Sequence, residues 1–272
     1  LLDSLLPSVD AVVHFAAESH VDRSVRDSGI FVETNVLGTQ RLLDAALRAD
    51  LKRFVHVSSL EACGPSRDGT PVNVTQEEPC TTYGRSKLAA ERAVIARKDK
   101  LPVTILRPGA IFGPRDAEIL EAFKTVHRGL LPTIAGGTAL GVFIHASDCA
   151  RACVDAIAAD VPSGSVYFIV DDTGPVTQRA FLEMVEAALD KRALLRISLP
   201  KSVLKQVAFG VQAFGKLTNK AVMLTPEKAN MLLQHFVCDS SEAQRALGWK
   251  PQTKLREGLR ETATWYKQAG WL

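Results

Sequence analysis

The sequence predicts an α/β fold in which a parallel sheet is covered by helices on both faces. Short apolar runs, rich in β-branched residues, recur along the chain in the manner of buried strands, at residues 10–15, 53–59, 103–107 and 166–170. Segments with apolar residues at helical spacing follow these runs. Alternation of strands and helices is the sequence pattern of a parallel sheet.

Helices are expected in order over residues 32–49, 83–97, 117–128, 147–159 and 178–189. In the first of them Val36, Leu43 and Leu47 recur at helical spacing. After residue 200 the chain is mostly helical, with Ser240 or Ser241 able to cap a helix and Gly248 able to end it. A last helix is expected over residues 255–268.

Composition limits the class of protein. The 272 residues are 46% hydrophobic and 23% charged, with a formal net charge of +3, as in soluble globular proteins. This charge is too small and too scattered for nucleic acid, and no apolar stretch is long enough for a membrane span. A small-molecule partner is therefore expected, with neither nucleic acid nor membrane. The five cysteines include no Cys-x-x-Cys pair, which suits the reducing cytoplasm.

One group of residues could hold a metal. His145, Cys149 and Cys153 fall on one helical stripe. No fourth ligand has the spacing of a zinc site, so small cysteines packing a helix against the sheet are the favoured interpretation. No metal is expected.

Small and polar residues follow three of the expected strands and point to a binding site. Ligands of open parallel sheets bind beyond the carboxyl ends of the strands. The residues found there are Ala16 and Ala17 after the first strand, Ser58 and Ser59 at the end of the second, and Pro108 and Gly109 after the third. Tyr83 begins the helix that follows the second strand's long loop. All of these features converge on one edge of the sheet.

Several blocks of sequence carry a resemblance to a known family. They include HFAAESHVDRS, RFVHVSSLEACGP, YGRSKLAAE, ILRPGAIFGPRD and the closing LGWKPQTKLREGLRETATWYKQAGWL. In this order they resemble the extended short-chain dehydrogenase/reductases, the NAD-dependent epimerase/dehydratase family. The resemblance spans essentially the whole chain and implies a Rossmann-like sheet, an NAD or NADP cofactor with NAD favoured, a nucleotide-sugar substrate and a possible homodimer.

By this resemblance, Tyr83 is the general acid/base and Lys87 is its partner. Ser59 bonds the reacting oxygen, and Asn35 orders the site through water. A free tyrosine titrates near pH 10, so a cation such as Lys87, one helical turn away, favours its phenolate. The same resemblance assigns Ala16, Ala17, Ser58, Tyr83, Lys87, Pro108 and Gly109 to the cofactor.

The chain departs from the family at its start. It contains no G-x-G-x-x-G or G-x-x-G-x-x-G, the turn that holds a dinucleotide's pyrophosphate, and it lacks an initiator methionine. We therefore expect a sheet that lacks its first βαβ units. We assign residues 1–113 and about 142–170 to the partial NAD(P)-binding domain, and about 114–141 and 171–272 to the substrate-binding region.

The loop after the second strand is a second departure. Nucleotide-sugar 4,6-dehydratases place Asp-Glu directly after the catalytic Ser/Thr, whereas this chain has Leu60 and Glu61. A leucine cannot protonate a leaving hydroxyl, so half of the elimination machinery is missing. Glu61 is open to two interpretations, a remaining base or a polar loop residue.

Substrate contacts are assigned to Ser59, Glu61, Arg115 and His145. Arg115 is the first choice for a diphosphate, because guanidinium binds phosphate in a bidentate manner. Asp148 and Arg107 have structural interpretations at least as good, and Trp249 and Trp265 are expected in the core of the smaller region. Two alternatives to a sugar-nucleotide epimerase or dehydratase stay open: a dehydrogenase of the 3β-hydroxysteroid or another hydroxy-compound type, and a non-catalytic nucleotide-binding relative.

Overall fold

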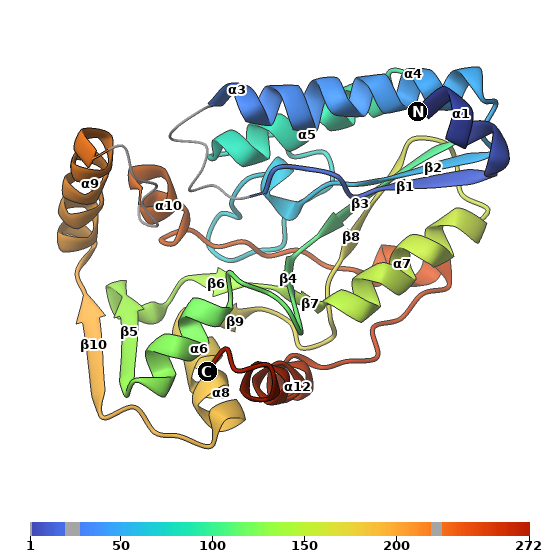
Figure 1. Ribbon diagram of the computed structural model, residues 1–272. Coiled ribbons are helices and arrows are strands. Elements are labelled where there is room, and N and C mark those ends of the chain that lie inside the picture. The colour runs from blue at the N-terminus through green and yellow to red at the C-terminus, as the bar shows by residue number, and fades with distance from the viewer. Residues whose placement is uncertain (1, 20–27, 219–224) are drawn as a thin grey trace.

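A four-stranded parallel sheet forms the centre of the molecule (Figure 1). The structure is a computed structural model that describes residues 2–19, 28–218 and 225–272. The strands lie in the order β1 (Ala11–His14), β2 (Arg53–Val57), β3 (Val103–Pro108) and β8 (Ser165–Ile169), and every neighbouring pair is parallel. The four predicted strands and their parallel arrangement are confirmed. Their carboxyl ends therefore share one edge.

Helices cover both faces of this sheet, as predicted. On one face α4 (Gly38–Arg48) and α5 (Thr82–Ile95) pack Leu43 and Val94 against Phe54 and Ile105. On the other face lie α7 (Ala146–Ala158) and α11 (Ser241–Leu247). The first turns, α1 (Leu2–Leu5) and η1 (Leu6–Ser8), precede β1.

The helix predicted over residues 32–49 is divided. It begins as α3 (Ser28–Phe31), continues as the π-helical turn η2 (Val32–Leu37) and ends as α4. π-Helical turns are uncommon and concentrate at functional sites. Asn35 lies in this turn and is almost fully buried. Apolar periodicity near 3.6 residues does not reveal a π-helical turn, so the sequence predicted one continuous helix.

Three helices build a second core beside the sheet. These are α6 (Leu120–His127), α8 (Gln178–Leu189) and α12 (Leu255–Gln268), whose side chains Phe123, Val185 and Leu259 are completely buried in one cluster. The bounds of α8 and α12 are those predicted. α6 begins three residues later than predicted, because Asp116 accepts hydrogen bonds from the backbone N–H groups of Glu118 and Ile119 and holds a turn there.

Six short strands were not predicted. They pair as β4 (Ala110–Phe112) with β7 (Phe143–His145), β6 (Leu140–Gly141) with β9 (Val176–Thr177), and β5 (Leu130–Ile134) with β10 (Leu195–Leu199). Most are too short to show an alternating pattern. After β10 come α9 (Lys201–Thr218) and α10 (Pro226–Met231), at the margin of the molecule in Figure 1. Two 3₁₀ turns complete the elements, η3 (Leu60–Ala62) and η4 (Ala135–Gly137).

One core prediction was wrong. Trp249 was expected in the smaller region, yet it is buried against the sheet with α7 and α11. Its indole N–H donates to the backbone oxygen of Asp148 at 3.0 Å. Trp265 does pack against the second core, as predicted. The position of Trp249 has a local cause, because Gly248, the preceding residue, ends α11 in the left-handed conformation and turns the chain toward α7.

No helix among the described residues is long and apolar enough to cross a membrane. The described residues also hold no group of three or more His, Cys, Asp or Glu side chains placed to bind a metal ion. Cys149 and Cys153 pack in the sheet's apolar cluster, in agreement with the packing interpretation.

Candidate active site

The candidate site lies where the parallel strands end. Ser58 and Ser59 follow β2, while Pro108 ends β3 and Gly109 follows it directly. At Gly109 a Cβ atom would lie 2.7 Å from the backbone oxygen of Val142, so only glycine allows this close approach of two segments. Ala16 is exposed and Ala17 half-buried after β1, which leaves the backbone open beside the sheet edge.

Ser59 and Tyr83 are held together by the way α5 begins. The hydroxyl of Thr81 caps α5 by accepting from the N–H of Gly84 at 2.9 Å, and it donates to the carboxylate of Glu61 at 2.6 Å. Ser59 in turn accepts from the backbone N–H of Glu61 at 3.2 Å and caps η3. The first turn of the tyrosine's helix is therefore tied to the serine's loop.

Gly84 allows the first turn of α5 to lie close to η3. A Cβ atom at this position would lie 2.4 Å from the backbone oxygen of Glu61. Every other residue type would push α5 away from η3, since such a distance is far below van der Waals contact. The glycine that follows Tyr83 therefore sets the distance between α5 and the loop that carries Ser59.

The phenol of Tyr83 is shielded from solvent. Burial is the largest cause that raises its pKa, and the charge of Glu61 adds to the rise, while a hydrogen bond with Ser59 opposes it. The ring packs edge-to-face on Phe31 with 6.5 Å between the ring centroids. The phenol accordingly carries its proton at neutral pH and can donate it.

Lys87 lies one helical turn beyond Tyr83 and is almost fully buried. Its ammonium donates to the backbone oxygen of Val57, the last residue of β2, at 2.7 Å. Burial lowers the pKa of Lys87 to about 8, and the charge of Glu91 opposes this shift. Because this pKa is close to neutral pH, a negative charge placed beside Lys87 would raise the pKa and increase the protonated fraction.

Two buried histidines, His14 and His56, lie close enough to Lys87 for its charge to affect their pKa values. Burial, followed by the charge of Lys87, lowers the pKa of His14 to about 4 and that of His56 well below its ordinary value. Their ring centroids are 5.4 Å apart. Both imidazoles are therefore neutral around pH 7, and Lys87 is the positively charged group among these three side chains.

Asn35 connects three segments of the site. Its amide oxygen accepts from the N–H of Glu18 at 2.7 Å, and its amide nitrogen donates to the oxygen of Glu18 and to the hydroxyl of Ser86. Ser86 in turn donates to the backbone oxygen of Tyr83 at 2.7 Å. Asn35 thus fixes the loop after β1 against the helix of the tyrosine.

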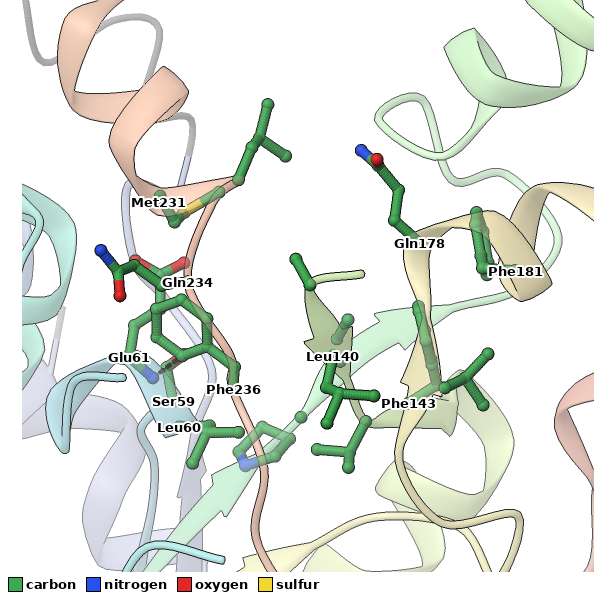
Figure 2. Close-up of a pocket in the computed structure, with 18 residues that line it drawn as sticks. Ser59, Leu60, Glu61, Leu140, Phe143, Gln178, Phe181, Met231, Gln234 and Phe236 are labelled. Carbon is green, nitrogen blue, oxygen red and sulfur yellow. Dashed lines mark hydrogen bonds between the residues drawn. The ribbon is translucent and has the colours of Figure 1, made fainter. Parts of the chain in front are cut away.

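A cavity of about 290 Å³ opens beside Ser59 (Figure 2). Ser59, Leu60 and Glu61 lie on one side of it, and Gln178 and Phe181 of α8 lie on the opposite side. Further residues of its lining come from the end of β3 with Gly109, from 139–143, and from the end of α10 and the segment after it, which contribute Met231, Leu232, Gln234 and Phe236. Pro108 and Gly109 were assigned to the site from the sequence. The sequence missed the lining residues from 139 onward, since no motif marks them and their elements lie far apart in the chain.

Arg115 and His145 were assigned to the substrate, but the structure does not bring them to this cavity. Arg115 is exposed in a turn with a positive φ of 73°. His145 is buried, its Nδ1 lies 2.7 Å from the hydroxyl of Ser147, and its ring packs edge-to-face on Phe112. Neither side chain lines the cavity that contains Ser59. Tyr83 and Lys87 are not among the lining residues either, but Tyr83 is linked to the cavity through its hydrogen bond with Ser59.

Arg107 and Asp148 have structural partners. Arg107 forms a buried bidentate ion pair with Glu91, with distances of 2.9 and 2.5 Å, and also donates to the backbone oxygen of Val74. The carboxylate of Asp148 is fully buried and accepts from the backbone N–H groups of Gln252 and Thr253. Both side chains hold elements together.

The residues assigned to the cofactor fit a nicotinamide nucleotide. The hydroxyl of Ser58 is buried and has no hydrogen-bond partner among the described residues, at the strand end where dinucleotides bind to such sheets. The ammonium of Lys87, which donates to the backbone oxygen of the preceding Val57, could also donate to ribose hydroxyls, and Ala16 and Ala17 leave room for a flat ligand. Part of the block HFAAESHVDRS, residues 20–24, lies outside the described residues.

Comparisons with known proteins agree with this geometry. Residues 2–169 match the model of the "NAD dependent epimerase/dehydratase family". The chain is 30% identical to a dTDP-glucose 4,6-dehydratase of an Actinoplanes species, over 98% of the chain and 76% of that protein. It is 31% identical to the dTDP-glucose 4,6-dehydratase of Streptomyces antibioticus, over 98% of the chain and 73% of the relative.

Solved structures give the same result. DesIV, a dTDP-glucose 4,6-dehydratase of Streptomyces venezuelae solved with NAD, superimposes with a TM-score of 0.77 at 28% identity, covering 99% of this chain and 78% of its own. A UDP-glucuronic acid 4-epimerase of Bacillus cereus, solved with UDP-glucuronic acid and NAD, has a TM-score of 0.78 at 25% identity and covers 98% and 78%. The chain therefore belongs to the NAD-dependent epimerase/dehydratase family and is an NAD-dependent enzyme of the sugar-nucleotide epimerase/dehydratase type.

Proposed function

We propose that the protein oxidises a secondary alcohol of a nucleotide-linked sugar, with Tyr83 as the acid/base and Ser59 and Lys87 beside it. The observation that carries this proposal is the joint fixation of Ser59 and Tyr83 by the Thr81 cap and by Gly84. The names of the relatives support a nucleotide sugar as the substrate class.

The chain's own residues then have separate tasks. Bound NAD would accept the hydride from the alcohol carbon. In the oxidation direction Tyr83 acts as the phenolate, a form that the positive charges of Lys87 and of bound oxidised NAD would favour, and takes the proton of the alcohol; as the phenol it returns that proton in the reverse direction, while Ser59 hydrogen-bonds the reacting oxygen. The ammonium of Lys87 stabilises the phenolate through its positive charge. Asn35 acts through the loops that it holds in place.

We further propose that the reaction does not proceed to the elimination of a hydroxyl. Leu60 is 4% exposed and presents a hydrocarbon side chain to the cavity, where it cannot protonate a leaving group. Burial raises the pKa of the neighbouring Glu61, whose carboxylate accepts from Thr81. Epimerisation, or simple oxidation, needs only the transfer of hydride and of one proton.

The test is incubation of the purified protein with NAD and nucleotide sugars deuterated at the ring carbon to be oxidised. Chromatography coupled to mass spectrometry would show either an epimer that keeps its deuterium or a ketone that has lost it to the reduced cofactor, and in both cases no loss of water. A dehydrated product from the wild-type protein would contradict the second proposal. Loss of water only after Leu60→Asp would support it, with Leu60→Asn as the control of equal size.

We also propose that residues 1–113 and about 142–170 serve the cofactor, and that 114–141 and 171–272 serve the substrate. The separate apolar clusters around the sheet and around α6, α8 and α12 support this division. Two parts of 171–272 are exceptions: α11 with Trp249 packs with the sheet, and Val237 and Cys238 pack with Leu60 and Phe168. Limited proteolysis with and without a nucleotide sugar would test the division.

A further inference from the structure

The lining of the cavity beside Ser59 is divided by polarity. Three of the four described side chains that could hydrogen-bond a substrate lie on one side, from Ser59, Glu61 and Gln234 (Figure 2). The fourth is Gln178 on the opposite side, whose amide oxygen already accepts from the N–H of Ile134 at 2.8 Å and whose amide nitrogen can still donate. The reacting alcohol therefore has a polar surface to bind, whereas the opposite surface is mostly apolar, with one amide group at its edge.

Hydrocarbon covers most of the remaining surface. Leu60, Leu140 and Phe236 lie on the floor of the view in Figure 2, and Phe143 and Phe181 stack with 4.9 Å between their ring centroids at its far side. Met231 and Leu232 add a third wall from α10. A ring substituent that faces these surfaces loses its water without gaining a hydrogen bond.

Charge restricts the ligand further. None of the described residues that line the cavity is a lysine or an arginine, and its charged group is the carboxyl of Glu61. A carboxylate on the substrate ring would be desolvated next to a like charge, which is a large cost without a paired cation. The diphosphate of a nucleotide sugar must likewise lie outside this cavity.

We propose that the cavity selects an uncharged, deoxygenated sugar ring, with its reacting alcohol at Ser59 and its hydrogen- or methyl-bearing carbons against Leu140, Phe181 and Phe236. This inference rests on the proposed function and specifies its substrate class. A hydroxyl that enters an apolar pocket lowers relative affinity by about 10- to 100-fold. We expect a nucleotide 6-deoxyhexose to bind at least tenfold more tightly than the matching hexose, and the matching hexuronate to bind most weakly.

The experiment measures equilibrium binding of these three ligands, all linked to one nucleoside diphosphate, to Tyr83→Phe protein with NAD present. This variant separates binding from turnover. Leu232→Arg should raise the affinity for the hexuronate relative to the deoxyhexose by about tenfold, because it supplies the missing cation. Leu232→Met is the control of similar volume, and Met231→Lys replaces the arginine variant if that protein fails to fold.

The outcomes separate the two proposals. Equal or tighter binding of the hexose or hexuronate, or binding of none of the three, overturns the selectivity for a deoxygenated ring. A deoxyhexose preference without hydride transfer by the wild-type protein supports the selectivity and overturns the proposed reaction. Hydride transfer with a hexuronate preference does the reverse. Binding of a nucleotide-free hydrophobic ring alcohol in place of all three overturns both.

Discussion

Two regions of the molecule differ in how firmly their side chains are fixed. The first is the reacting region, residues 53–95, which runs from β2 to the end of α5. Here Val57 is 4% exposed and Lys87 is 3% exposed. The second is the outer region, residues 191–212, with β10 and the first part of α9. In it Leu194 is 94% exposed and Phe209 is 70% exposed.

The difference shows where this fold uses close packing. In the reacting region there is no room for a Cβ atom between Gly84 and the backbone of Glu61. An added methyl group there would therefore change the distance between Ser59 and Tyr83. In the outer region β10 pairs only with β5 among the described strands, and neither of its faces is covered by a core. Substitutions should therefore have large effects in the first region and small effects at the exposed positions of the second, in which Leu204 and Ala208 are buried.

Tyr83→Phe should have the largest effect. Removing the hydroxyl that exchanges a proton with the substrate should lower kcat by about 10²- to 10⁴-fold. The binding of nucleotide sugar should change little, because the ring and its contact with Phe31 remain. Steady-state kinetics and calorimetric binding provide the measurement. Turnover equal to that of the wild type would remove Tyr83 from the chemistry.

Arg107→Ala should have the next largest effect, on stability. It leaves the carboxylate of Glu91 buried and unpaired, which costs about 3–5 kcal/mol of unfolding free energy. The matched control is Arg92→Ala, since Arg92 pairs with Glu77 at 2.6 Å on the surface, where side-chain exposures are 65% and 45%. That pair should contribute only about 0–1 kcal/mol. Urea denaturation of both variants measures the difference, and equal losses would contradict the buried role of Arg107.

Gly84→Ala compares the two regions directly. We expect a loss of about 1–3 kcal/mol of stability and lower activity, because the new Cβ meets the backbone of Glu61. Its control is Gly210→Ala in α9, where a Cβ would meet nothing within 4 Å. The control should gain about 0.5–1 kcal/mol, as alanine favours helix. The comparison fails if the two variants change the melting temperature in the same direction.

The pH dependence of activity should show the smallest effect. The pKa of Lys87 is lowered to about 8, so its positive charge is present below this pH and is lost above it. If that charge stabilises the phenolate of Tyr83, as we propose, kcat/KM should fall by about fivefold between pH 8 and pH 9. Lys87→Arg keeps its charge throughout this range and should lack the decline. The same decline in both proteins would assign it to another group.

The lowered pKa of Lys87 should also make the free energy of unfolding depend on pH. Its folded pKa lies below its unfolded value near 10.5, so between about pH 8 and pH 10 the unfolded chain binds more protons. The contribution of Lys87 to stability should therefore rise with pH across this window. Urea titrations of the wild type and of Lys87→Met at pH 8 and pH 10 test it.

The sequence predicted the reacting region better than it predicted the substrate region. The strands at residues 53–57 and 103–108 and the helix of Tyr83 have strong local patterns; Ser59 lies two residues after β2, and Tyr83 lies in the first turn of α5. Arg115 and His145 were chosen because of their residue types, and neither lines the cavity. A residue type indicates what a side chain can bind, but it does not indicate which surface the side chain reaches.

By itself the sequence determined the parallel sheet, the edge where its strands end, the helix that carries Tyr83 and Lys87, and the family to which the chain belongs. These features depend on periodicity and on motifs within short segments. Only the tertiary structure decided that Phe181, Gln234 and Phe236 share a cavity with Ser59, and that Trp249 packs on the sheet. Contacts between residues that are distant in the chain depend on how elements pack together, and no local pattern encodes that packing.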